Sequence, residues 1–123
     1  GAWRTIETPL LLADAIRGAA VAGNAVLVDC LTLWLANLME AGADLAAETG
    51  GLVATLEQAE GPVVFVSNEV GAGIIPDNAL ARAYSDAHGI LNQRVAAAVG
   101  RVVLVTAGLP LLLKPSRQGP ITL

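Results

Sequence analysis

Cysteine, histidine, aromatic residues and charge are all scarce in this chain. It contains one cysteine, Cys30, and one histidine, His88, so neither an internal disulfide nor a zinc site of the usual Cys/His spacing can form. A lone cysteine indicates a reducing compartment, and we expect a cytoplasmic protein. Only 15% of the residues are charged and the net charge is −4, which argues against a basic face that binds nucleic acid.

Long hydrophobic runs are also missing. No apolar stretch approaches the roughly 18–20 residues that a membrane span requires, and no basic region followed by an apolar run opens the chain. Aliphatic residues are abundant instead, since 54% of the chain is hydrophobic. Its 123 residues are enough for a single core, so residues 1–123 are expected to form one soluble α/β domain.

Short β-branched runs alternate with helical patterns along the chain. Buried strands are predicted at 25–30, 63–68 and 102–108. Helical patterns lie before and between them at 8–23, at 31–42 and 44–61 with a separation near Gly42, and at 76–100. This alternation predicts a parallel sheet with right-handed crossovers. Weaker patterns indicate a strand at 3–7 and another near the C-terminus.

Particular residues predict where the helices begin and where they are interrupted. Thr8 is a candidate N-cap, with Pro9 at the first helical position. The glycine pair at 50–51 predicts a break in the helical region 44–61, and Gly89 predicts a weak point in the last one.

Asp29 ends the first predicted strand, at the edge of a parallel sheet where ligands bind. An acidic residue after a buried strand is typical of a Walker-B site, where it holds Mg²⁺ beside nucleotide phosphates. The alternative is that Asp29 caps the helix that begins at Leu31. The pattern alone supports both interpretations equally.

Ser67, Asn68 and Glu69 end the second predicted strand, before a glycine-rich turn. Gly71 and Gly73 permit positive φ angles, so exposed N–H groups there could cradle an anion. The spacing is neither GxGxxG nor a P-loop, and an ordinary connecting loop fits it somewhat better.

Three other residues have side chains that could serve a site. Glu7 could accept hydrogen bonds from a base edge or ribose hydroxyls, although a solvated charge near a helix start is the simpler interpretation. We interpret His88 as a surface side chain rather than a base. Cys30 is expected to pack as a small hydrophobic residue.

Four ordered blocks carry a resemblance to a known family: "WRTIETP", "VLVDCLTLWLANLM", "VVFVSNEVGAGIIPDNALARAYSDAHGILNQRVAAAV" and "VVLVTAGLPLLLK". From Trp3 to Lys114 the chain resembles the bifunctional adenosylcobinamide kinases/adenosylcobinamide-phosphate guanylyltransferases of cobalamin biosynthesis. The block "SNEVGAGIIPDNALAR…LNQ" is the most specific part of this likeness.

The resemblance implies a P-loop NTPase fold of the RecA type, with a three-layer parallel sheet, and a homotrimer. It implies phosphorylation of adenosylcobinamide by ATP or GTP, followed by transfer of GMP from GTP to give adenosylcobinamide-GDP. Glu7 and Asp29 match positions that contact guanine nucleotide, with Asp29 as the Mg²⁺ candidate. The family's most specific block contains four residues that are expected to line the site: Asn68, Glu69, Gly71 and Gly73.

Two elements of the family are missing from this sequence. The family has an N-terminal P-loop of the G-x-x-x-x-G-K-S kind and a nucleotide-accepting histidine just before the tryptophan that corresponds to Trp3. No catalytic residue is therefore assigned here, and His88 does not inherit that role. We expect the chain to be the C-terminal two-thirds of the family's domain, without the N-terminal strand and P-loop, and inactive alone.

Two alternatives remain open at this point. The chain could be a degenerate, non-catalytic paralogue that binds a corrinoid or a protein partner. It could also be a different P-loop kinase that shares only the α/β skeleton.

Overall fold

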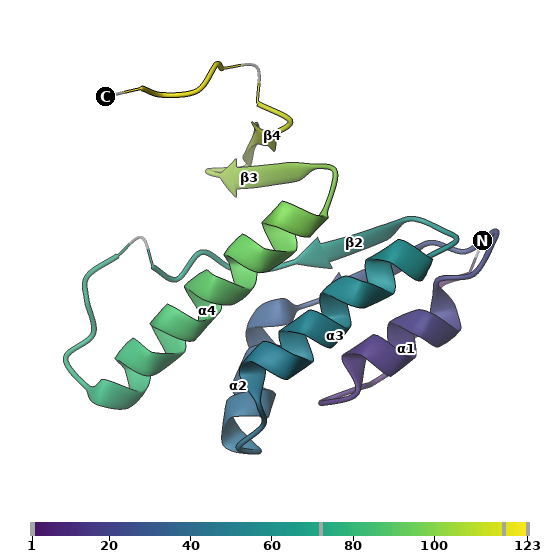
Figure 1. Ribbon diagram of the computed structural model, residues 1–123, viewed down its shortest axis with the longest axis horizontal. Helices are drawn as coiled ribbons and strands as arrows, with labels where there is room; N and C mark the ends of the chain where they lie inside the picture. Colours follow the sequence, from purple (N-terminus) through teal and green to yellow (C-terminus); the bar gives the residue numbers. More distant parts are fainter. Residues whose placement is uncertain (1, 72, 117, 123) are drawn as a thin grey trace.

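The computed structural model describes residues 2–71, 73–116 and 118–122. Helices and strands alternate along a mixed α/β chain, as Figure 1 shows. In order, the elements are α1 (Leu12–Ala19), β1 (Val26–Asp29), α2 (Leu31–Glu40), α3 (Leu45–Gln58), β2 (Val63–Val66), α4 (Ala79–Ala98), β3 (Val102–Thr106) and β4 (Leu109–Lys114).

Strands β1 and β2 form a parallel pair, which confirms the predicted parallel sheet for these two strands. Val26 lies opposite Val63 and Asp29 lies opposite Val66. Because the strands run in the same direction and end in register, the residues that follow them emerge at one edge of the sheet.

Strand β3 does not join this sheet within the described residues, so the prediction of a third parallel strand is wrong. It pairs antiparallel with β4, and the two form a separate hairpin. The turn between them consists of Ala107 and Gly108, whose φ angles are 53° and 74°. Two consecutive residues in the left-handed region form the tight turn that suits a two-residue hairpin.

The core lies on one face of the β1–β2 sheet, beneath the helices. Val28 on that face is buried, whereas Leu27 and Val64 on the other face are 52% and 56% exposed. The described helices therefore cover one face, and the expected three-layer arrangement is not confirmed. The helices contribute most of the core: Leu12, Ile16, Leu31, Trp34, Leu35, Leu38, Leu52, Leu91 and Val95.

The first helix begins three residues later than predicted, at Leu12 rather than at Pro9. Side chains of α2 hold the preceding backbone, because Trp34 Nε1 donates to the Leu10 carbonyl at 3.0 Å and Asn37 Nδ2 donates to the Pro9 carbonyl at 3.1 Å. Residues 3–7 form no strand.

Helices α3 and α4 run without interruption through their glycines, contrary to the break predicted at 50–51. Each begins with a side-chain cap, because the Asp44 side chain accepts from the Ala47 amide and the Asn78 side chain accepts from the Ala81 amide. Packing against the core outweighs the low helix propensity of glycine here. None of the described helices has the combination of length and apolar character needed to cross a membrane.

Candidate nucleotide site

Asp29 is the last residue of β1, and its side chain is exposed at the carboxyl edge of the sheet. The helix that follows is capped by Cys30, whose sulfur accepts from the Leu33 amide at 3.5 Å. The alternative interpretation of Asp29 as the cap of this helix is therefore wrong. The Asp29 carboxylate is therefore left available for another role. Cys30, expected to pack only as a small hydrophobic residue, also caps a helix.

The end of β2 is joined to the start of α2 by one hydrogen bond. The Asn68 amide donates to Thr32 Oγ1 at 3.0 Å. Ser67 and Asn68 follow directly after β2, and Thr32 lies three residues after Asp29. The two strand ends that were predicted to meet are thus brought together, although the roles of these residues stay predictions.

Behind this junction lies a cluster of polar side chains, which we name the His88 cluster: Thr32, Ser67, His88 and Asn92. His88 is 0% exposed, so its interpretation as a surface side chain is wrong. Its Nε2 atom lies 3.0 Å from Thr32 Oγ1 and 3.3 Å from Ser67 Oγ, and its Nδ1 atom lies 3.2 Å from Asn92 Nδ2.

Asn92 and Tyr84 complete the contacts around His88. Asn92 accepts from Ser67 Oγ at 2.6 Å and donates to the Asn68 carbonyl at 3.0 Å. Tyr84 donates its hydroxyl to the Thr32 carbonyl at 2.8 Å, and its ring centre lies 5.8 Å from that of His88. Burial lowers the pKa of His88 below its usual 6.5, while the Glu69 carboxylate opposes this effect more weakly.

The glycine-rich loop does not form the anion cradle that its glycines could allow, as the preferred interpretation of an ordinary connecting loop expects. Gly71 has no φ angle in the left-handed region. The Gly71 amide donates to the Glu69 carboxylate at 3.3 Å, so one candidate donor already has an internal partner. Glu69, Gly71 and Gly73 are exposed beside the end of β2. In this conformation Gly71 does not use the freedom that a glycine provides.

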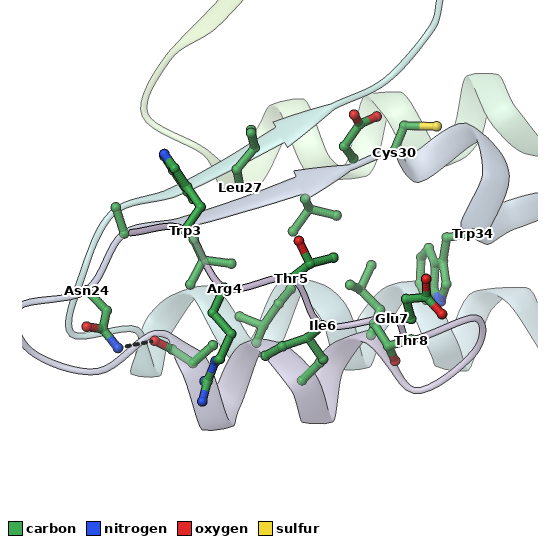
Figure 2. A pocket seen from close by; sticks show the side chains of 18 of the residues that line it. Trp3, Arg4, Thr5, Ile6, Glu7, Thr8, Asn24, Leu27, Cys30 and Trp34 are labelled. Carbon is green, nitrogen blue, oxygen red and sulfur yellow. Dashed lines mark hydrogen bonds between the residues drawn. The ribbon is translucent and has the colours of Figure 1, made fainter. Parts of the chain in front are cut away.

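A large open groove runs along the side of β1 that faces away from β2. It has a volume of about 1170 Å³ and is lined by the N-terminal segment 2–9, by α1, by β1 and by the start of α2. Glu7 and Asp29 both line it. Figure 2 shows Glu7 at the same end of the groove as Cys30 and Trp34, while Trp3 lies toward the other end.

The donors near Asp29 suit a metal that is shared with a phosphate rather than a closed metal site. Within the described residues, no three His, Cys, Asp or Glu side chains are grouped so that they could hold an ion together. Magnesium in nucleotide sites is commonly held by one or two carboxylates together with phosphate oxygens and water. A single exposed carboxylate at the end of β1 fits that pattern.

Thr32, Asn92 and the burial of His88 were not predicted from the sequence. One signal was available, because Tyr84, His88 and Asn92 recur at intervals of four residues on α4 and so lie on one helix face. Polar residues that repeat on the face a helix buries indicate a hydrogen-bonded network. Thr32 gave no such signal, because its contact with Asn68 joins residues 36 positions apart.

Comparisons with known proteins relate the sequence to one family. The family described as cobinamide kinase / cobinamide phosphate guanyltransferase matches residues 1–113. The chain is 45% identical over 114 residues to the bifunctional adenosylcobalamin biosynthesis protein CobP of Pseudomonas aeruginosa. It is 34% and 36% identical, each over 127 residues, to the proteins named CobU of Escherichia coli and Salmonella typhimurium.

These alignments cover 91% of the chain but only part of each relative. They take in 66% of the Pseudomonas protein and 70% of each of the other two. The chain thus spans about two thirds of the length of the relatives it matches. The family match nevertheless extends over most of the present sequence, including Glu7, Asp29 and the His88 cluster. The chain belongs to the cobinamide kinase / cobinamide phosphate guanyltransferase family.

Proposed function

We propose that this chain supplies the nucleotide-binding carboxyl edge of an enzyme of cobalamin biosynthesis. The enzyme phosphorylates adenosylcobinamide with ATP or GTP and then transfers GMP from GTP to the new phosphate, giving adenosylcobinamide-GDP. The family match supports the reaction class. The observation that carries the location is the junction of the two strand ends, where Asn68 is bonded to Thr32 beside Asp29.

In this proposal the nucleotide lies against the carboxyl ends of β1 and β2. Asp29 would hold Mg²⁺ together with the phosphates, and a bound ion there would supply positive charge to offset theirs. Glu7 contacts the guanine base or the ribose from the facing segment of the groove, because its exposed carboxylate is an acceptor for N–H and O–H groups. Asn68, Glu69, Gly71 and Gly73 line the site from the β2 side.

The groups that carry out the chemistry lie outside these 123 residues. The sequence contains no G-K-[ST] motif, and its one histidine is buried and hydrogen bonded. We propose that a P-loop segment adds to the unpaired side of β1 along the groove, and that the chain alone is inactive. The length of the relatives and the exposed Leu27 and Val64 support an additional covering segment.

We also propose a homotrimer in the cytoplasm for the complete protein. Hairpin β3–β4 supports a contact between subunits, because it carries a set of exposed apolar residues: Val103, Leu104, Val105, Leu109, Leu111, Leu112 and Leu113. Light scattering coupled to size-exclusion chromatography tests this directly, since a trimer has about threefold the mass of one chain. A monomeric mass at micromolar concentration would contradict it.

The test of the site is the substitution Asp29→Asn in the complete gene product. Isothermal titration with GTP is expected to show a loss of affinity of about 100-fold in the presence of Mg²⁺, because a charged metal ligand is removed. Without Mg²⁺ the variant and the wild type should bind GTP equally weakly.

Asp86→Asn is the matched control, since Asp86 is an exposed carboxylate on α4. It should leave GTP affinity unchanged. A folded wild-type protein that does not bind guanine nucleotide would overturn the proposed function and favour a non-catalytic paralogue. Phosphorylation of other alcohols in preference to cobinamide would instead indicate a different kinase.

A further inference from the structure

His88 has a role that can be read from the atoms around it. The Asn68 carbonyl oxygen can only accept, so the Asn92 atom 3.0 Å from it must be the amide nitrogen, Nδ2. That same nitrogen lies 3.2 Å from His88 Nδ1. A donor facing Nδ1 requires a lone pair there, so the ring carries its proton on Nε2 and is neutral.

The Nε2–H group points at hydroxyls that are themselves fixed. Thr32 Oγ1 lies 3.0 Å from Nε2 and also accepts from the Asn68 amide, so both of its lone pairs are used. Asn92 meanwhile holds the Asn68 carbonyl from the other side. His88 thus links the two groups, Thr32 and Asn92, that bond the N–H and the C=O of one backbone residue.

We propose that His88 is a positioning residue of the nucleotide site, which acts through Thr32 and Asn92 to hold the Asn68 backbone against the Asp29 end of β1. This inference rests on the proposed function for its effect on nucleotide binding. The geometry makes His88 a support for the site and not the group that accepts a nucleotide, since no part of its ring is exposed.

A pair of substitutions separates positioning from mere packing. In His88→Gln the side-chain amide retains a donor near Thr32 and an acceptor near Asn92, whereas His88→Leu has a similar size and neither group. We expect His88→Leu to weaken GTP binding to the complete gene product about tenfold, as the loss of one or two hydrogen bonds implies. His88→Gln should bind within about threefold of the wild type.

Leu91→Ala is the control for general destabilisation, because Leu91 is 1% exposed on the same helix and is not a member of the His88 cluster. It should lower the melting temperature and leave the GTP affinity of the folded protein unchanged. If His88→Leu does not fold, the pair Thr32→Val and Thr32→Ser asks the same question, since only serine keeps the hydroxyl that receives the Asn68 amide.

A second readout is independent of GTP. His88 is the only histidine of these 123 residues, and in the complete gene product its ¹⁵N-histidine signals are identified as those that disappear in His88→Gln. The spectrum should show a protonated Nε2 and an unprotonated Nδ1, and the Asn68 amide should exchange more slowly in the wild type than in His88→Leu. An Nδ1–H tautomer, or unchanged exchange and GTP affinity in folded His88→Leu, would overturn the proposal. If wild-type protein does not bind GTP but shows the expected tautomer and exchange, only the proposed function fails.

Discussion

The two sides of strand β1 differ in how completely they are paired and hydrogen bonded. Toward β2, the strand is paired in register and its end is bonded through Thr32 to Asn68, with the His88 cluster behind. On the other side it borders an open groove of about 1170 Å³, and on the sheet face that the helices leave uncovered Leu27 is 52% exposed. The β2 side is a hydrogen-bonded junction between two strands, whereas the groove side is open to a further segment of chain.

A substitution in the helical core should have the largest effect on stability. Leu52 is 0% exposed between the packed helices, and Leu52→Ala is expected to lower the free energy of unfolding by about 3 kcal/mol, from lost burial and the cavity that remains. Urea denaturation followed by circular dichroism measures this. A loss below about 1 kcal/mol would mean that the core collapses around the smaller side chain.

Removal of Asn92 should be the next largest effect. Asn92→Ala leaves Ser67, His88 and the Asn68 carbonyl without a partner, and we expect a loss of about 2 kcal/mol in the free energy of unfolding. Asn92→Asp is the sharper variant, because it keeps the acceptor for Ser67 and places a negative charge beside Nδ1. The pKa of His88 should then rise above its wild-type value, and an unchanged pKa in a histidine NMR titration would contradict the bonding scheme.

Acid should lower the stability of the fold through His88, which lies behind the β2 side of β1. Burial lowers the pKa of His88 below 6.5 in the folded chain, so the unfolded chain binds a proton first as the pH falls. Stability is expected to be constant, as far as His88 contributes, above pH 6.5 and to fall as the pH decreases toward the lowered pKa. Glu69 and Tyr84 are the other titratable groups near the ring. Subtracting the pH profile of His88→Gln isolates the histidine, and identical profiles would contradict this assignment.

The smallest effect in the isolated chain should come from a substitution on the sheet face that the helices leave uncovered. Leu27→Ser removes an exposed side chain, and we expect a change within about 0.5 kcal/mol in the free energy of unfolding. If a further segment covers β1 in the complete gene product, the same substitution there should cost about 2 kcal/mol, because leucine is then buried. Equal effects in the two proteins would indicate that nothing covers this face of the sheet.

Features set by local pattern were predicted well from the sequence. Strands β1 and β2 each stand out as a short apolar run that ends in polar residues, and parallel pairing follows from the helices between them. That rule also placed Asp29 and Asn68 at one edge. The α1 start was misplaced because Trp34 and Asn37, far along the chain, hold the backbone before it.

Features set by tertiary contact or by weak turn signals were not predicted. Strand β3 resembles the other strands in sequence, and the left-handed turn at Ala107 and Gly108 directs it into a hairpin. His88 sits beside a glycine in a polar stretch, so its burial depends on Thr32 and Ser67 reaching it from other elements. Gly71 in the loop after Glu69 suggested a positive φ angle that the chain does not use.

Hydrogen–deuterium exchange of the complete gene product, with and without Mg²⁺ and GTP, locates the bound nucleotide on the chain. We expect GTP to slow exchange at 29–32 and 67–71, the two segments that meet at the carboxyl edge of the sheet, and to leave the β3–β4 hairpin unaffected. Bound GTP that protects other segments and leaves both of these unchanged would contradict a nucleotide site at this edge.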